Sequence, residues 1–208
     1  MLSQLLGMDV YLLPVSSLLG SVLFWPTIIA LVATAARFYR TGAGGTRTFF
    51  ALVFVLYLSV LVEIAFFPLP FDFQEMALLQ SSASYIRPEA NLIPFRTIFM
   101  ALQDVTPMGI RFMIRNFLGN FLLLLPLGLL MPMLLPNFSH SRRAFAFVAA
   151  TAFSLEFLQF LGTFLVFRIN WRVVDVDDIL LNILGGMLGF LCYKTFSSAR
   201  HRLKPERQ

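Results

Sequence analysis

The chain has 208 residues, of which 58% are hydrophobic and 13% charged, and its formal net charge is +5. Soluble domains are roughly 45–50% apolar and roughly 25% charged, so a water-soluble protein of this length could not bury so much apolar surface. Together with a mean hydropathy of +0.79, this argues against the soluble, disordered and disulfide-stapled classes and indicates a polytopic membrane protein. The single cysteine, Cys192, excludes an intramolecular disulfide and an all-cysteine metal site.

Five segments are long and apolar enough to cross a membrane, which takes about 20 mostly apolar residues. They are residues 16–36, 48–67, 117–135, 144–167 and 179–196. Residues 1–14 are apolar but contain no Lys or Arg, so we interpret them as part of the mature chain rather than as a cleavable signal peptide. The predicted fold is an all-α, polytopic membrane helix bundle with about five transmembrane helices.

The placement of Lys and Arg in the connections predicts the orientation of these spans. One side would carry ten basic residues and a single acid, Glu206, whereas the other side would carry six arginines and eight acids. The C-terminal end belongs to the basic side. We therefore predict a multi-pass protein with its N-terminus outside and its C-terminus in the cytoplasm. The basic tail is expected to contact anionic lipid headgroups, and nothing else in the sequence supports a nucleic-acid partner.

The second connection, residues 68–116, is long for a compact bundle. Asn91-Leu92-Ile93-Pro94-Phe95 opens a short apolar piece that ends near Leu102. Because this piece is too short to span, we expect an interfacial or re-entrant segment on the outer face. Thr106-Pro107-Met108-Gly109 follows, a pattern typical of a turn.

These elements predict four regions along the chain. Residues 1–70 would form an N-terminal two-helix membrane region, and residues 71–115 an extracytoplasmic loop with the interfacial segment. Residues 116–197 would form a three-helix core, whose motifs begin at residue 91, and residues 198–208 a basic cytoplasmic tail.

Polar side chains inside the spans lie at mid-membrane or in the outer half. Such groups are costly there and usually face the bundle interior or a water-filled cavity. Three helices each carry two of them at a spacing that places both on one helix face: Asn116 with Asn120, Glu156 with Gln159, and Asp178 with Asn182. Three such faces at similar depth would share a cavity open to the outside. Alternatively, the amides only hydrogen-bond across helices and hold the bundle together. Glu63, near the outer end of the second span, is expected at the level of the headgroups.

The acids before the fifth span, Asp175, Asp177 and Asp178, have a structural and a functional interpretation. Structurally, Asp177 or Asp178 would cap the following helix, and Asp175 would pair with Arg172. Functionally, the three carboxylates near Glu156 could hold a divalent cation through oxygen ligands. Their spacing matches no established cation-binding loop, so we assign no metal site.

Small residues mark the last spans. Gly185 and Gly189 are four positions apart, with Gly186 between them, and this spacing favours close helix approach over ligand contact. Pro126 and Gly128 are expected to loosen the third span near its middle.

Several of these residues form motifs in a recognisable order: NLIPF at 91–95, PLG at 126–128, EFLQ at 156–159 and RVVDVDD at 172–178, followed by Asn182 and the glycines. In these motifs the chain resembles the VanZ-like family of bacterial membrane proteins, named for a protein of glycopeptide-resistance clusters. The resemblance covers about residues 91–194. It implies a protein of the bacterial cell envelope, located in the cytoplasmic membrane, with a link to glycopeptide (teicoplanin-type) resistance. The sequence itself shows no antibiotic-specific feature.

The first functional hypothesis is a binding protein. An outward-facing polar cavity bounded by apolar helices suits an amphiphile, either a membrane lipid or a lipid-linked envelope precursor. The expected ligand-binding residues are Asn91, Asn116, Asn120, Gln159, Arg172 and Asn182. The sequence does not identify a cofactor or a protein partner.

The second hypothesis is an outer-leaflet enzyme that modifies a lipid-linked phosphate or an envelope polymer. Both histidines and Cys192 fall near the cytoplasmic side, so only carboxylates remain as acid or base. Its catalytic residues would be Glu156, Asp175 and Asp178, and the cations facing the substrate would come from Arg96, Arg111, Arg115, Arg168 and Arg172. A transporter ranks third, because the sequence has no recognisable inverted repeat and no polar face in the cytoplasmic half.

Overall fold

The computed structural model of the chain describes residues 23–42, 44–66, 90–103, 106–167 and 172–202. The chain divides into two compact units, Met1–Leu69 and Pro70–Gln208. Within the described residues, four helical stretches are long and apolar enough to cross a membrane: Gly45–Phe66, Pro107–Leu134, Ser141–Val166 and Val176–Ala199. They correspond to the second to fifth predicted spans, so the all-α membrane helix bundle is confirmed.

The described residues of the first unit form two helices, α3 (Phe24–Arg40) and α4 (Gly45–Phe66). Hydroxyl groups link them, because Oγ1 of Thr27 and Oγ of Ser59 are hydrogen-bonded at 2.9 Å. The helix α3 is the described part of the first predicted span, whose residues 16–22 lie outside the described residues, as do residues 1–14.

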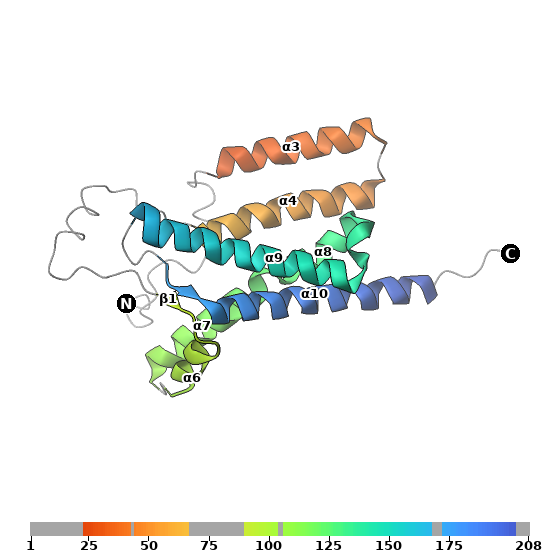
Figure 1. Ribbon diagram of the computed structural model, residues 1–208. Helices are drawn as coiled ribbons and strands as arrows, with labels where there is room; N and C mark the ends of the chain where they lie inside the picture. The colour runs from red at the N-terminus through yellow and green to blue at the C-terminus, as the bar shows by residue number, and fades with distance from the viewer. Residues whose placement is uncertain (1–22, 43, 67–89, 104–105, 168–171, 203–208) are drawn as a thin grey trace, which may run out of the picture. The chain divides into compact units, whose positions relative to one another are not determined.

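The second unit is the larger one and is mostly helical (Figure 1). Within the described residues, its helical elements in chain order are α6 (Arg96–Gln103), α7 (Pro107–Leu123), α8 (Leu125–Leu134), the 3-10 helix η1 (Pro136–Ser139), α9 (Ser141–Phe160), the π-helix η2 (Leu161–Phe167) and α10 (Val176–Arg202). The short helix α6 matches the apolar piece expected to end near Leu102. Its interfacial or re-entrant placement stays a prediction, as do the four predicted regions of the chain.

The third span differs from the prediction at its start. The helix α7 begins at Pro107, ten positions before the predicted residue 117, so the prediction of a turn at residues 106–109 is wrong. Thr106 is the N-cap of the helix, and its side-chain oxygen accepts a hydrogen bond of 3.0 Å from the N–H of Gly109. Threonine at the N-cap followed by proline at the first helical position starts a helix. The expected loosening near Pro126 is confirmed, because the helix breaks at Leu124 between α7 and α8.

Glycines bring the backbone of α10 against that of α7 and α8. A Cβ added at Gly185 would lie 1.7 Å from the carbonyl oxygen of Phe121, and one at Gly189 would lie 2.0 Å from that of Leu125. On the facing helix, a Cβ at Gly128 would lie 1.8 Å from the carbonyl oxygen of Gly186. No side chain fits at these contacts, so the predicted close helix approach is confirmed.

A two-stranded parallel sheet, which the sequence did not predict, joins two distant motifs. The strand β1 (Ala90–Asn91) pairs with β2 (Val174–Asp175), and Asn91 is the register partner of Asp175. The sheet lies with α6 at the end of the second unit where α10 begins (Figure 1). It therefore places the NLIPF segment beside the RVVDVDD segment.

Candidate functional site

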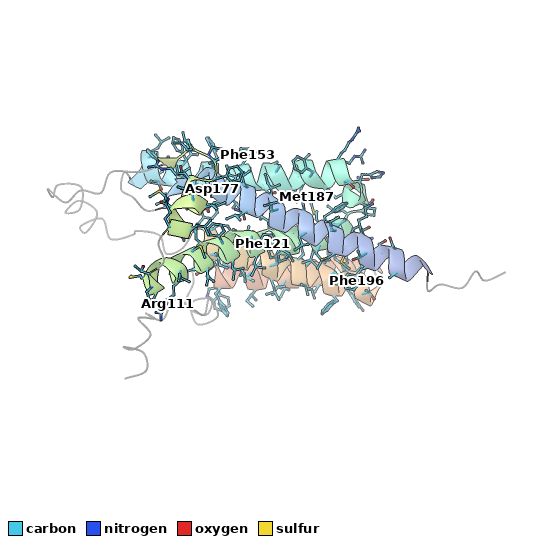
Figure 2. The ribbon with its side chains drawn as sticks, turned by 90° about the horizontal axis from the view of Figure 1, so that it is seen from below. Arg111, Phe121, Phe153, Asp177, Met187 and Phe196 are labelled. Carbon is cyan, nitrogen blue, oxygen red and sulfur yellow. The ribbon has the colours of Figure 1, made fainter. Side chains whose placement is uncertain are left out.

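The predicted site residues gather at one end of the second unit, where α9 ends and α10 begins. Figure 2 labels Asp177 at this end of α10 and Phe196 towards its other end. The contacts below join α7, α9, α10 and the β1–β2 pair. The polar faces predicted on separate helices are thus brought together.

Asp175 is the centre of the contacts between the two motifs and is only 4% exposed. Its Oδ1 accepts hydrogen bonds from Nδ2 of Asn91 at 2.9 Å and from the N–H of Asp177 at 2.8 Å. The Thr97 hydroxyl donates to its Oδ2. Both carboxylate oxygens of Asp175 therefore accept hydrogen bonds from the protein. These bonds hold Asn91 and Thr97 beside β2 and satisfy the N–H of Asp177 in the first turn of α10.

Asp177 caps a different helix from the one expected. Its carboxylate accepts hydrogen bonds from three backbone N–H groups at the start of α6: Phe95, Thr97 at 3.0 Å and Ile98 at 3.3 Å. Phe95 has a φ of 66°, a backbone conformation that is uncommon for residues other than glycine. Of the two acids predicted to cap α10, Asp177 does not do so, because its carboxylate holds α6 at the end of the bundle. Both Asp177 and Asp178 lie in the first turn of α10, as predicted.

Glu156 ties the end of α9 to the sheet. Its side chain is 5% exposed, and its Oε2 accepts a hydrogen bond of 3.2 Å from the N–H of Asp175. Just beyond it, fully buried Thr163 in η2 donates to the carbonyl oxygen of Arg172 at 2.9 Å and accepts from its N–H at 3.2 Å. The chain entering β2 is therefore held on both sides by side chains of α9 and η2.

The polar pairs on α7 (Asn116 and Asn120) and α10 (Asp178 and Asn182) face each other. Nδ2 of Asn116 donates a hydrogen bond of 3.2 Å to Oδ1 of Asp178, and Asn120 also lies beside this carboxylate. Asn182, one turn along α10, is 1% exposed, and its Oδ1 has no hydrogen-bond partner among the described residues. Gln159 on α9 is half-buried and makes polar contacts. Glu63, in the first unit, is buried, and its expected position at the level of the headgroups stays a prediction.

Two of the expected arginines lie beside this cluster. Arg172 is half-buried and Arg115 on α7 is exposed. Burial lowers the pKa of Arg172 and the nearby Arg115 guanidinium lowers it further, while Glu156 acts in the opposite direction. Arg96 and Arg111 are exposed, and Arg168 lies outside the described residues.

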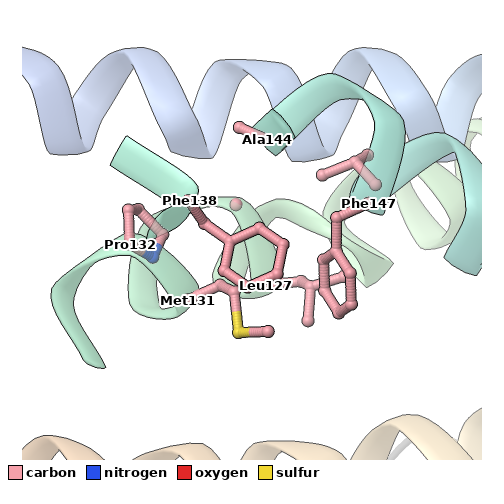
Figure 3. A pocket seen from close by; sticks show the side chains of 8 residues that line it. Leu127, Met131, Pro132, Phe138, Ala144 and Phe147 are labelled. Carbon is pink, nitrogen blue, oxygen red and sulfur yellow. The ribbon is translucent and has the colours of Figure 1, made fainter. Parts of the chain in front are cut away.

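A cavity in this unit is apolar and lies away from the carboxylates. It is found between α8, η1 and α9 (Figure 3). Its volume of about 10 Å³ is near the minimum needed for one water molecule. Its lining includes Leu127, Met131, Pro132, Phe138, Ala144 and Phe147. The polar cavity open to the outside therefore stays a prediction.

The described part of the chain contains no group of three or more His, Cys, Asp or Glu side chains arranged to hold a metal ion. The acids instead receive hydrogen bonds from the chain. Of the three carboxylates considered as cation ligands, Asp175 and Asp177 have both oxygens bonded in this way.

Sequence reasoning missed Thr97 and Thr163. Thr97 contacts Asp175, which lies 78 positions later, and Thr163 contacts the main chain of Arg172 from within the π-helix. Neither spacing follows a helical or strand period. The one available signal is that Thr97 closely follows the NLIPF segment.

A family model described as VanZ/LLP1 matches residues 54–197, more than two thirds of the chain. The matched range contains all the residues of the cluster described above. No curated protein and no solved structure matches the chain.

Proposed function

The chain belongs to the VanZ/LLP1 family, and from this membership and the polar cluster we propose that it is a cell-envelope membrane protein that binds the polar head of an amphiphile. The amphiphile is a membrane lipid or a lipid-linked envelope precursor. Its head contacts the group formed by Glu156, Asp178 and Asn182, which we call the acceptor cluster. In the orientation given by the positive-inside rule, this cluster lies at the extracytoplasmic end of the bundle.

The unpartnered oxygen of Asn182 carries the proposal. A buried acceptor without a donor costs about 1–3 kcal/mol, and such orphan groups in native structures call for an explanation, such as a bound water or ion or a functional role. Asn182 lies one turn from Asp178 on the same face of α10. A hydroxyl, amine or amide of a bound head group would donate to this oxygen.

The membrane location of the protein supports an amphiphile rather than a water-soluble ligand. Ile114, Leu118 and Leu122 are exposed on α7 at intervals of four residues, so they lie along one helix face. Asn116 and Asn120 are offset from them by two residues and lie on the opposite face of α7. The exposed apolar face therefore suits contact with lipid, while the acceptor cluster lies on the other side of the helix.

The enzyme hypothesis uses the same residues with different roles. Glu156 and Asp178 would be the acid and base acting on a lipid-linked phosphate or envelope polymer. Asp175 suits a catalytic role less well, because both of its oxygens accept hydrogen bonds from the chain. Binding needs only the acceptors that are present, so we place it first.

Lipids that copurify with the full-length protein test the proposal. Wild type, Asn182→Leu and the exposed control Asn137→Leu would be purified in maltoside micelles, and their bound lipids identified by mass spectrometry. We expect an amphiphile enriched over the bulk membrane in wild type and in the control, and lost in Asn182→Leu. The same variant should keep or raise its melting temperature, because leucine removes the unpaired acceptor. Identical lipid profiles in all three proteins would contradict the proposal.

A second arm separates binding from catalysis. The purified protein would be incubated with an envelope lipid extract and the products compared with those of Glu156→Gln. Recovery of an unaltered amphiphile supports a binding protein. A new product that forms with wild type but not with Glu156→Gln would contradict the binding proposal and support the enzyme hypothesis.

The proposal extends to glycopeptide (teicoplanin-type) resistance when the bound amphiphile is an envelope precursor. Expression in a susceptible bacterium should then raise the inhibitory concentration of teicoplanin, and Asn182→Leu should abolish the increase. An unchanged inhibitory concentration would contradict the link to resistance. It would not affect the binding proposal, which the copurified lipids test separately.

A further inference from the structure

A groove lies between α3 and α4, at the end of the first unit where α3 ends and α4 begins. The two helices run side by side in opposite directions (Figure 1). The groove has a volume of about 760 Å³, within the range of about 300–1,000 Å³ that ligand pockets occupy. Its lining includes Val32, Ala36 and Tyr39 of α3 and Gly45, Phe49 and Leu52 of α4.

Each helix lines the groove with a single face. On both helices the lining residues recur at intervals of four and three, which is the period of one helix face. Ala36 and Gly45 leave space in the middle of the groove, and a Cβ added at Gly45 would meet no atom within 4 Å. The larger side chains of Val32 and Phe49 are exposed. The groove is therefore a mainly apolar slot, open along one side, that fits an alkyl chain.

Aromatic side chains mark the two ends of the exposed face of α3. Trp25 lies at the start of the helix and Tyr39 near its end, and both are exposed. They are 14 positions apart, so they lie on the same side of the helix and about 21 Å apart along its axis. Trp and Tyr are enriched at the two interfaces of a membrane. The end of the groove at Tyr39 is therefore at the level of the lipid headgroups.

A cation stands at this end of the groove. Arg40 is exposed in the last turn of α3 and follows Ala36 by four positions, so it shares a helix face with this lining residue. Among the described residues of the first unit the only acid is Glu63, near the other end of α4. No acid is therefore available at the groove to pair with Arg40, and the combination of apolar slot and cation is complementary to an anionic amphiphile.

We propose that this groove binds one anionic phospholipid, with an alkyl chain in the slot and the phosphate at Arg40. The positive-inside rule would place this end of the two helices at the cytoplasmic leaflet, whose surface is negative because it contains anionic lipids. The site belongs to the first unit and takes an anion. The acceptor cluster belongs to the second unit and takes hydrogen-bond donors, so the two proposals are independent.

Native mass spectrometry of the full-length protein tests the site. Protein in maltoside micelles would be titrated with dioleoyl phosphatidylglycerol and with dioleoyl phosphatidylcholine, which have the same alkyl chains but differ in net charge. We expect the phosphatidylglycerol to bind at least about fivefold more tightly, because one basic residue near a membrane surface contributes about this factor. Arg40→Gln should abolish this preference.

Arg37 supplies a matched control for the charge. It is also exposed in the last turn of α3, but it is turned about 100° from Ala36 and about 160° from Tyr39 around the helix. Arg37→Gln should therefore keep the preference for phosphatidylglycerol. An equal loss in Arg37→Gln and Arg40→Gln would show a diffuse attraction to the basic end of the helix and would overturn the defined site.

Ala36→Leu tests the groove without removing a charge. The position is exposed and leucine is a strong helix former, so the helix is kept while the larger side chain fills the slot. We expect phosphatidylglycerol to bind at least about fivefold more weakly, the effect of forcing extra methylene groups into an occupied space. The control Ala33→Leu changes an exposed residue of α3 outside the groove lining and should bind as wild type does.

Three further outcomes would overturn the proposal. The first is equal affinity of wild type for the two lipids, or an unchanged affinity in Ala36→Leu. The second is a dimer that Ala36→Leu dissociates, which would assign the groove to a second copy of the chain. The third is a loss of phosphatidylglycerol in Asn182→Leu, which would place this lipid at the acceptor cluster. Unchanged binding in Asn182→Leu is the expected result and separates the two sites.

Discussion

The side-chain amide of Asn91 donates a hydrogen bond of 2.9 Å to Oδ1 of Asp175, 84 positions later in the chain. The two residues are also register partners in the β1–β2 pair, so main chain and side chain join the same two segments. The NLIPF and RVVDVDD segments therefore form one structural unit. This unit closes the end of the bundle at which the acceptor cluster lies.

Asp177→Ala should release α6 from the bundle. The carboxylate accepts three backbone hydrogen bonds at the start of α6, and hydrogen bonds to a charged group contribute about 1.5–3 kcal/mol each, without strict additivity. We expect unfolding to become easier by about 3 kcal/mol and residues 90–103 to be cleaved faster in limited proteolysis. An unchanged cleavage rate would show that α6 is held by other contacts.

Asn116 and Asp178 should be energetically coupled. Hydrogen bonds between membrane helices contribute about 0.6 kcal/mol on average, so a double-mutant cycle of Asn116→Ala and Asp178→Ala should give a coupling of this size. Denaturant unfolding in micelles measures each free energy. The control pairs Asp178→Ala with Asn137→Ala, whose effects should add within about 0.5 kcal/mol. Additivity in both cycles would rule out the coupling.

Gly185→Ala should destabilise the bundle far more than Gly119→Ala. The new Cβ would lie 1.7 Å from the carbonyl oxygen of Phe121, whereas at Gly119 no atom lies within 4 Å. Gly119→Ala even gains about 0.5–1 kcal/mol of helix propensity. Thermal unfolding of the two variants measures the contrast. Similar melting temperatures would mean that α10 can move away from α7 at little cost.

The orientation predicts opposite labelling at the two ends of the second unit. In a Cys192→Ala background, Val173→Cys and His140→Cys each place one thiol at an exposed position. A membrane-impermeant maleimide added to intact cells should label position 173, and position 140 only after the membrane is opened. The reverse pattern would invert the proposed topology.

The structural features that were predicted correctly from the sequence are those that depend on local periodicity. Apolar runs gave the spans that the structure contains, and the four-residue spacing of Asn116 with Asn120 and of Asp178 with Asn182 predicted polar faces that do meet. The spacing of Gly185 and Gly189 likewise predicted the close helix contact. Each of these signals is complete within one helix.

Most of the features that the sequence did not predict depend on contacts between distant segments. Asp177 sits in the first turn of α10, where an acid normally caps its own helix, yet its carboxylate reaches Phe95, 82 positions earlier. The β1–β2 pair has two residues in each strand, too few for an alternating pattern to be detected. The start of α7 was misread because proline marks both turns and first helical positions.

The glycine contacts also determine which way α10 faces. Asp178, Asn182, Gly185 and Gly189 recur at intervals of four, three and four residues, so one stripe of the helix carries the acceptors first and the glycines after them. Because the glycines meet backbone and not flexible side chains, the helix can neither rotate nor slide without a collision. One alanine inserted between Asn182 and Gly185 would turn the acceptors by about 100° relative to the glycines. Such a chain would keep the glycine contacts of α10, but it would lose the contacts of its first turn with α6 and α7 and, with them, its amphiphile.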